Sequence, residues 1–247
     1  MKYIFGNWKM YLNNDESIAF AEELKKQSFK NKNVEIAFFP TALSLAFVYK
    51  VLKKSGVNFG AQNCAWASKG AYTGAISALM FKEVGCKYAL VGHSERRYIF
   101  GDSNEIVRKK LEAIAGAGLM PVLCIGETKE EKDANTTSDC LKKQLMTGLQ
   151  GLKINDGKII IAYEPVWAIG TNNPCHPSDA NDAHEFIKQE IKKYFTEDVP
   201  VLYGGSVNAN NAASYTKLAA VDGVLVGGAS VKINTFMPLV KAVRNSI

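Results

Sequence analysis

The sequence lacks the patterns that would place it in a membrane or an oxidising compartment. Its 247 residues contain no run of about 18 apolar residues, so we expect no membrane-spanning helix. The first residues turn polar after three apolar positions and lack the apolar core of a signal peptide. The five cysteines are odd in number and widely spaced, with no CxxC pair, which favours the reducing cytoplasm.

Patterns for metal or nucleic-acid binding are also missing. Only three histidines occur, and no HExxH or paired Cys/His spacing is present, so we expect no metal site. The net charge of +6 could suit nucleic acid or a small anion. However, the lysines alternate with acidic residues at 22–26 and 188–193, which is typical of solvated helix faces. Because no basic stripe carries interleaved aromatic residues, we expect no nucleic-acid partner.

Short apolar runs alternate with amphipathic stretches along the whole chain. Two helices are well patterned: residues 15–29 follow a capping Asn14, and residues 179–195 follow Ser178. Weaker helices are expected at 43–54, 78–85, 103–117, 138–150, 208–218 and 232–245. Strands are expected at 3–5, 34–39, 58–61, 88–92, 121–125, 158–163, 201–203 and 223–226.

The alternation of eight strands with eight helices predicts an α/β fold with a parallel sheet. Most of the strands are apolar throughout, as expected for parallel strands covered by helices on both faces. No GxGxxG follows any strand, and no low-complexity linker divides the chain. We therefore predict a single (β/α)8 barrel domain over residues 1–247, with an open doubly wound sheet as the alternative.

The segment after the sixth predicted strand joins a carboxylate to an apolar loop. Glu164 stands where the strand should end, because Pro165 cannot donate to a sheet ladder. Residues 166–170 are too apolar for an ordinary solvated loop. This combination fits a general base beneath a closing lid. A glutamate that caps a neighbouring helix explains the segment equally well at this point.

Other polar side chains follow the predicted strands, where barrel enzymes carry their active sites. They are Asn7, Lys9, Gln62, Asn63, His93, Ser94, Glu95 and Arg96. His93 precedes residues that could begin a helix, and a helix N-terminus favours a neutral imidazole that can polarise a carbonyl. The ordinary alternatives are a structural histidine for His93 and a surface lysine for Lys9.

Glycine pairs follow the seventh and eighth predicted strands, at 204–205 and 227–228. Tight turns use such pairs, but barrels commonly bind phosphate at this position through backbone N–H groups. A base, a neutral donor, a cation and a phosphate site suit proton removal beside the carbonyl of a small phosphorylated molecule. A lid would keep water from the resulting enediolate.

Eight motifs resemble the triosephosphate isomerase family, in that family's order and over the whole chain. They are GNWKM at 6–10, GAQN at 60–63, AYTG at 71–74, VGHSERR at 91–97, CIGE at 124–127, AYEPVWAIGT at 162–171, YGGSV at 203–207 and VGGAS at 226–230. The resemblance implies interconversion of dihydroxyacetone phosphate and D-glyceraldehyde 3-phosphate in glycolysis, gluconeogenesis and glycerol catabolism. It also implies that no cofactor is needed.

The resemblance assigns roles to individual residues. It makes Glu164 the base and His93 the neutral electrophile, and Lys9 stabilises charge. Asn7 assists at the substrate oxygens, and Glu95 positions the surroundings of Lys9 and His93. The implied substrate and phosphate ligands are Asn7, Lys9, Gly170, Ser206, Gly227 and Gly228. The implied lid is Pro165, Val166, Trp167, Ala168, Ile169 and Thr171, which Tyr203 and Ser206 hydrogen-bond when it is closed.

The family is usually a homodimer, and the resemblance places Thr73, Arg96 and Met10 at the interface. Ala75 stands where the family usually has a glutamate that pairs with the partner subunit's arginine. Tyr11 and Leu12 replace a usual Asn-Gly pair. The trailing lid hinge, residues 172–176, also differs from the family. We therefore expect the kinetics of lid motion to differ from those of the family.

Two other functions remain open at this stage. One is a different phosphate-binding barrel enzyme, such as a Schiff-base aldolase that uses Lys9. The other is a barrel without catalysis that serves as a binding module or adhesin.

Overall fold

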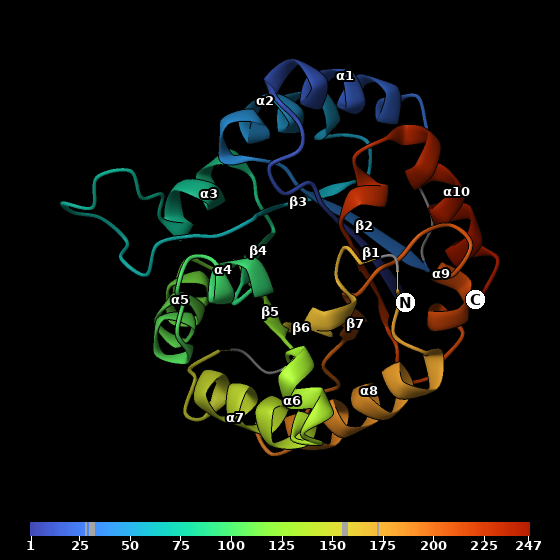
Figure 1. Cartoon of the computed structure of the whole chain (residues 1–247). Coiled ribbons are helices and arrows are strands. Elements are labelled where there is room, and N and C mark those ends of the chain that lie inside the picture. Colours follow the sequence, from blue (N-terminus) through green and yellow to red (C-terminus); the bar gives the residue numbers. More distant parts are fainter. Residues whose placement is uncertain (28, 30–32, 155–157, 172) are drawn as a thin grey trace.

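Eight parallel strands pair in chain order and close into a barrel, because β8 pairs with β1 (Figure 1). The computed structural model describes residues 1–27, 29, 33–154, 158–171 and 173–247. The strands are β1 (Lys2–Asn7), β2 (Val34–Phe39), β3 (Asn58–Ala61), β4 (Tyr88–Val91), β5 (Met120–Ile125), β6 (Ile160–Tyr163), β7 (Val201–Tyr203) and β8 (Gly223–Val226). Each predicted strand is present within two residues of its expected ends, and the predicted barrel is confirmed.

Helices surround the barrel in a ring (Figure 1). They are α1 (Asn14–Lys25), α2 (Ala42–Leu52), α3 (Ala78–Val84), α4 (Ser94–Tyr98), α5 (Asn104–Gly116), α6 (Lys129–Asp133), α7 (Thr137–Leu149), α8 (Pro177–Ile191), α9 (Ala212–Thr216) and α10 (Ile233–Arg244), with 3-10 turns η1 (Val166–Ala168) and η2 (Gly228–Ser230). Within the described ranges, none of the helices is long and apolar enough to cross a membrane.

The expected count of eight helices was wrong, because the structure adds α4 and α6. Each is a five-residue helix in the loop after a strand, at the carboxyl end of β4 or β5. One turn and a half is too short to show an apolar period of 3.6 residues, so the sequence pattern does not reveal such helices. Both lie at the end of the barrel where the site is expected.

The predicted capping residues were also wrong for the two well-patterned helices. Asn13, not Asn14, caps α1: its side chain accepts the N–H of Glu16, whose carboxylate accepts the N–H of Asn13. His176, not Ser178, caps α8, which begins at Pro177. Both helices end earlier than expected, at Lys25 and Ile191, and residue 28 lies outside the described part of the chain.

Strand alternation determines which side chains enter the barrel. A buried cluster inside it contains Phe5 from β1, Leu90 from β4 and Ile160 and Ala162 from β6. The intervening residue Ile161 instead joins the cluster between the barrel and the helices. Because side chains alternate along a strand, the next inward position after Ala162 is residue 164. The fold therefore directs a carboxylate into the carboxyl end of the barrel.

Candidate active site

The end of β1 contributes Asn7 and Lys9, and the backbone of Lys9 is held on both sides. Lys9 has a φ of 48°, an unusual value for a residue other than glycine. Its N–H donates to Oδ1 of Asn7 at 3.0 Å, and its carbonyl accepts from Nε2 of Gln62 at 2.8 Å. Gln62 also donates to the carbonyl of Phe39 at 2.9 Å. The neighbouring strands therefore hold Lys9 in a strained conformation.

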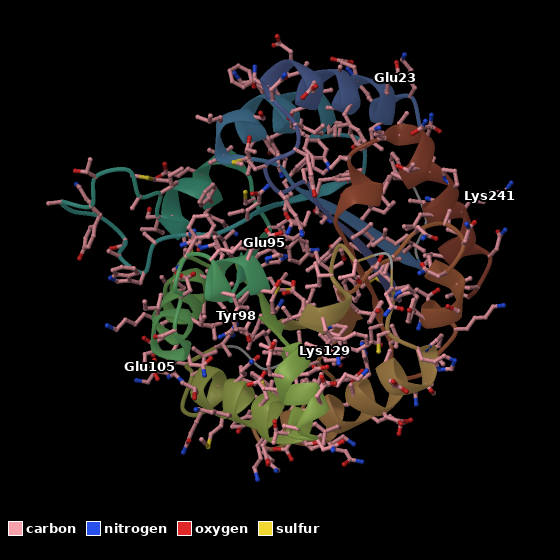
Figure 2. The ribbon with its side chains drawn as sticks, viewed as in Figure 1. Glu23, Glu95, Tyr98, Glu105, Lys129 and Lys241 are labelled. Carbon is pink, nitrogen blue, oxygen red and sulfur yellow. The ribbon has the colours of Figure 1, made fainter. Side chains whose placement is uncertain are left out.

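The ammonium group of Lys9 reaches α4. Its Nζ lies 2.7 Å from Oε1 of Glu95, and the other carboxylate oxygen of Glu95 lies 3.7 Å from Nδ1 of His93. In Figure 2, Glu95 lies towards the middle of the ring of helices, whereas Glu23 and Lys241 lie on its outer rim. Glu95 thus stands beside both residues that it was expected to position.

His93 is turned towards the barrel mouth by a glycine and oriented by a backbone N–H. Gly92 has a φ of 70°, a conformation that favours glycine and that interrupts the strand just before His93. The N–H of Glu95 donates to Nδ1 of His93 at 3.2 Å. A nitrogen that accepts a hydrogen bond carries no proton, so the proton of the neutral ring resides on Nε2. Nε2 is therefore the ring nitrogen of His93 that remains available at the cavity, which His93 lines.

Glu164 follows β6 and is almost fully buried, with 2% of its surface exposed. Its Oε2 accepts the N–H of Ser94 at 2.9 Å. Its Oε1 lies 3.3 Å from Nε2 of His93, although the two atoms are not aligned for a hydrogen bond. The carboxylate and the imidazole N–H are therefore neighbours at the same end of the barrel.

A close approach of two backbones places Glu164 there. A Cβ atom added to Gly126 would lie only 1.7 Å from the carbonyl oxygen of Glu164, so no larger residue fits. The N–H of Glu164 donates to the carbonyl of Ile125 at 2.7 Å. The sequence reasoning quoted Gly126 within a motif but gave it no role. Its position directly after a strand was the only available signal.

Eight of the nine predicted catalytic and phosphate-binding residues, together with one predicted lid residue, line one cavity of about 300 Å3. They are Asn7, Lys9, His93, Glu164, Ile169, Gly170, Ser206, Gly227 and Gly228. The cavity also contains Tyr11 and Asn208, which the sequence reasoning did not assign to it. Within the described chain, the N–H groups of Ser206 and Gly228 meet no hydrogen-bond acceptor. Free N–H groups beside Lys9 suit an anionic ligand.

The leading end of the lid is anchored to Glu127. Trp167, in η1, donates its indole N–H to Oε1 of Glu127 at 2.7 Å, and Tyr163 donates its hydroxyl to the same oxygen at 3.1 Å. Lys132 of α6 lies 3.5 Å above the centre of the Trp167 ring. Burial raises the pKa of Glu127. The sequence reasoning assigned no role to Glu127, although this residue follows Gly126 after β5.

Two tyrosines hold Cys175, which follows the expected lid in the chain. The N–H of Cys175 donates to the hydroxyl of Tyr203 at 3.2 Å, and the hydroxyl of Tyr215 donates to the carbonyl of Cys175 at 2.5 Å. The two rings are stacked, with centroids 4.0 Å apart. Tyr203, to which the resemblance assigns the latch of the closed lid, thus contacts residue 175 just after the expected lid. No hydrogen bond joins residues 169–171 to Ser206 in the part of the chain described, and Asn172 lies outside it.

The residues expected at an interface include one on a projecting loop. Figure 1 shows the loop between β3 and α3 extending away from the barrel, and Thr73 lies within it. Met10 is 94% exposed. Arg96 is already engaged within the chain, since its Nη2 lies 3.2 Å from Oδ1 of Asp102. Asp102 therefore forms an ion pair within the chain with Arg96, which the resemblance would place in an ion pair between subunits.

The described residues contain no group of three or more histidine, cysteine, aspartate or glutamate side chains that could hold a metal ion. The expectation that the site uses neither metal nor cofactor stays a prediction.

Comparisons with known proteins agree with this geometry. The family model of triosephosphate isomerase matches residues 2–243. The chain is 41% identical to triosephosphate isomerase from Dictyoglomus thermophilum over 98% of its length and 99% of that protein. It is 42% identical to that of Aquifex aeolicus, over 97% of this chain and 98% of the relative. The crystal structure of triosephosphate isomerase from Bartonella henselae superposes with a TM-score of 0.85 at 34% identity, covering 98% of this chain and 99% of that one. The chain belongs to the triosephosphate isomerase family.

Proposed function

We propose that this chain interconverts dihydroxyacetone phosphate and D-glyceraldehyde 3-phosphate by proton transfer through an enediolate. The observation that carries the proposal is the meeting of Glu164 and His93, 3.3 Å apart, in one cavity with Lys9. Membership of the triosephosphate isomerase family supports the same activity. The glycolytic setting follows from the family.

The carboxylate of Glu164 takes the proton. It removes a proton from the substrate carbon beside the carbonyl, and the electron pair of that C–H bond forms the enediolate double bond. The carbonyl oxygen becomes an oxyanion at the same time. The oxyanion then takes up the proton of the hydroxyl on the adjacent carbon. Glu164 returns its proton to the former carbonyl carbon while the adjacent carbon becomes the aldehyde, which completes the change from ketose to aldose. No atom is gained or lost overall, so no co-reactant is required.

His93, Lys9 and Asn7 stabilise the oxyanion. The Nε2–H of His93 donates to the substrate oxygen, and the ammonium of Lys9 offsets the growing negative charge. A preorganised donor of this kind typically contributes ~3 kcal/mol in the transition state. Glu95, which contacts Lys9 at 2.7 Å, acts as a positioning residue for both of these groups.

Backbone N–H groups of Gly170, Ser206, Gly227 and Gly228 bind the phosphate in the proposal. Closure of residues 165–171 over the cavity excludes water, which prevents loss of phosphate from the enediolate. Tyr203 and Ser206 form the latch of the closed lid.

A coupled assay tests the proposal directly. Purified protein should convert glyceraldehyde 3-phosphate to dihydroxyacetone phosphate, measured by reduction of the product with an NADH-dependent dehydrogenase. Phosphoglycolate, which resembles the enediolate, should inhibit competitively because it fits the transition state better than the substrate. A protein that folds but shows no turnover would contradict the proposal and leave the non-catalytic binding or adhesin role.

The Schiff-base alternative has its own test. The Schiff-base route requires the Lys9 nitrogen to attack a substrate carbonyl, but that nitrogen is engaged by the carboxylate of Glu95 at 2.7 Å. Borohydride added during turnover should therefore trap no substrate on Lys9. A trapped adduct at Lys9 would favour the aldolase mechanism.

We also infer a homodimer of one-domain subunits in a reducing compartment such as the cytoplasm. Large apolar side chains are exposed on the projecting loop, on α3, and in the segments that follow β1 and α4: Met10, Trp66, Tyr72, Ile76, Leu79, Met80, Ile99 and Phe100. Such a patch is larger than single surface apolar residues require, and a second subunit would cover it. All five cysteines are free, which suits a reducing compartment.

A further inference from the structure

A second cavity, of about 260 Å3, lies behind the lid between α6, α7 and α8. It shares no lining residue with the substrate cavity. Its walls include Trp167 and Cys175, which are the two held ends of the lid. Whatever fills this cavity therefore contacts both ends of the segment that must move.

One wall of the cavity is a buried carboxylate that is only half satisfied. Glu127 is 1% exposed, and its Oε1 accepts from both Trp167 and Tyr163. Its Oε2 has no hydrogen-bond partner among the residues that the structure describes. Leaving such an oxygen unpaired in a buried position is unfavourable, so a donor placed beside it would be stabilised.

The charges around the cavity favour a cation. Glu127, Asp179 and Asp182 contribute carboxylates, whereas Lys132 is the single basic side chain lining the cavity. Lys132 is already engaged, with its Nζ 3.5 Å from the centre of the Trp167 ring and 3.7 Å from Asp179. The opposite side of the cavity offers the apolar side chains of Leu141 and Phe186.

We propose that this cavity binds a small organic ammonium ion, which donates to Oε2 of Glu127 and packs its apolar body against Leu141 and Phe186. Desolvation raises the pKa of Glu127, as expected for a buried carboxylate. The volume of the cavity is below that of most drug-sized pockets, so the ligand is a compact amine.

The bound ammonium ion holds the lid in the arrangement described above. Closure requires Trp167 to move, and a ligand packed beside its ring is lost or strained when it does. A ligand that prefers one of two arrangements shifts the population towards it. The amine therefore lowers kcat without competing with substrate. This effect rests on the proposed function, whereas binding itself does not.

Phenethylammonium is the probe, with 2-phenylethanol and phenylacetate as neutral and anionic controls of similar shape. The chain has three tryptophans, so a 15N-labelled sample gives three indole N–H signals, and Trp167→Phe identifies the one from Trp167. The amine should shift the Trp167 signal saturably, and the two controls should not. Equal shifts with all three compounds, or none with the amine, would overturn the proposal.

Two variants test the location of the site. Glu127→Gln keeps acceptors for Trp167 and Tyr163 but removes the charge, and should weaken amine binding about tenfold. Asp182→Asn, at an exposed position, should weaken it about twofold to threefold. Glu130→Gln, on α6 but outside the cavity, should bind as the original protein does. Thermal unfolding checks that each variant is folded.

The outcomes separate this proposal from the proposed function. Either of two results would place the bound amine elsewhere and refute the site. One is unchanged amine binding in folded Glu127→Gln, and the other is inhibition by the amine that is competitive with substrate. Binding is measured on the free protein, so it can succeed even if the isomerase assay fails. If the isomerase assay succeeds but the amine does not bind, the proposed function stands and only the proposed amine site is refuted.

Discussion

The backbone N–H of Ser94 donates a hydrogen bond of 2.9 Å to Oε2 of Glu164, which holds the carboxylate against the first residue of α4. In the proposed mechanism the same carboxylate must leave Ser94 to reach the substrate carbon. The packing around the Glu164 side chain therefore bears directly on the rate of reaction.

Gly204→Ala is expected to slow the reaction without unfolding the protein. A Cβ atom at this position would lie 2.9 Å from Cγ of Glu164, so the carboxylate must shift. A misplacement of about 1 Å in a reacting group can cost 10²-fold. We expect kcat to fall roughly tenfold to a hundredfold, measured with saturating substrate.

Gly116→Ala is the matched control for that change. Gly116 ends α5 with no heavy atom within 4 Å of an added Cβ. This variant should keep its kcat and gain about 0.5 kcal/mol of stability. Equal kcat values for the two alanine variants would show that packing at Gly204 does not position Glu164.

Tyr215→Phe tests whether the trailing hinge controls the lid. The substitution removes the donor to the carbonyl of Cys175, which costs about 1 kcal/mol in the arrangement described here. We expect faster microsecond-to-millisecond exchange of residues 173–176, measured by NMR relaxation dispersion. Tyr194→Phe, whose hydroxyl does not contact the lid, is the control. Identical exchange in both variants would remove this role from Tyr215.

Thr73→Lys tests the inferred dimer. Thr73 is exposed on the projecting loop, and a charge buried there without a partner would oppose association. Sedimentation should show the original protein at twice the 27.0 kDa chain mass and the variant shifted towards monomer, with lower kcat/KM. Met146→Lys, an exposed apolar residue on α7, should sediment like the original protein. A monomeric original protein with full activity would contradict the inference.

His184 should make the protein less stable in acid. It is fully buried, and desolvation lowers its pKa from 6.5 to about 3 in the folded protein. Between these pH values the unfolded chain binds one proton more than the folded protein. The contribution of neutral His184 to the free energy of unfolding is therefore complete above pH 6.5. That contribution is lost as the pH falls towards 3, by up to about 1.4 kcal/mol per pH unit.

His184→Gln keeps an N–H donor for the carbonyl of Ala220 but does not titrate. Its free energy of unfolding should therefore depend less steeply on pH between 6.5 and 3, measured by urea denaturation. The same slope in both proteins would show that His184 does not cause the effect.

Local patterns predicted the barrel because its strands and main helices each carry enough apolar residues to show a period. They did not predict α6, and they suggested α4 only as a turn that the residues after His93 could begin; both are short helices that follow β5 and β4. The capping error at Asn13 arose because two adjacent asparagines follow Leu12, and only the backbone shows which one accepts the N–H of Glu16.

The site residues at strand ends could be predicted because a barrel gathers those positions at one end. Contacts made by residues far apart in the sequence could not. Nothing local links Gly126 to the carbonyl of Glu164, or Glu127 to the indole of Trp167. The placement of Tyr11 in the wall of the candidate site was likewise not predicted, since nothing in the local sequence points to it.

The turnover of Glu164→Gln tests the central claim most directly. Glutamine keeps an acceptor for the N–H of Ser94 but cannot take a proton, so kcat should fall by at least about 10³-fold while the thermal unfolding profile changes little. Glu105→Gln, an exposed carboxylate on α5, should retain full activity. Near-normal turnover in folded Glu164→Gln would contradict the assignment of Glu164 as the base.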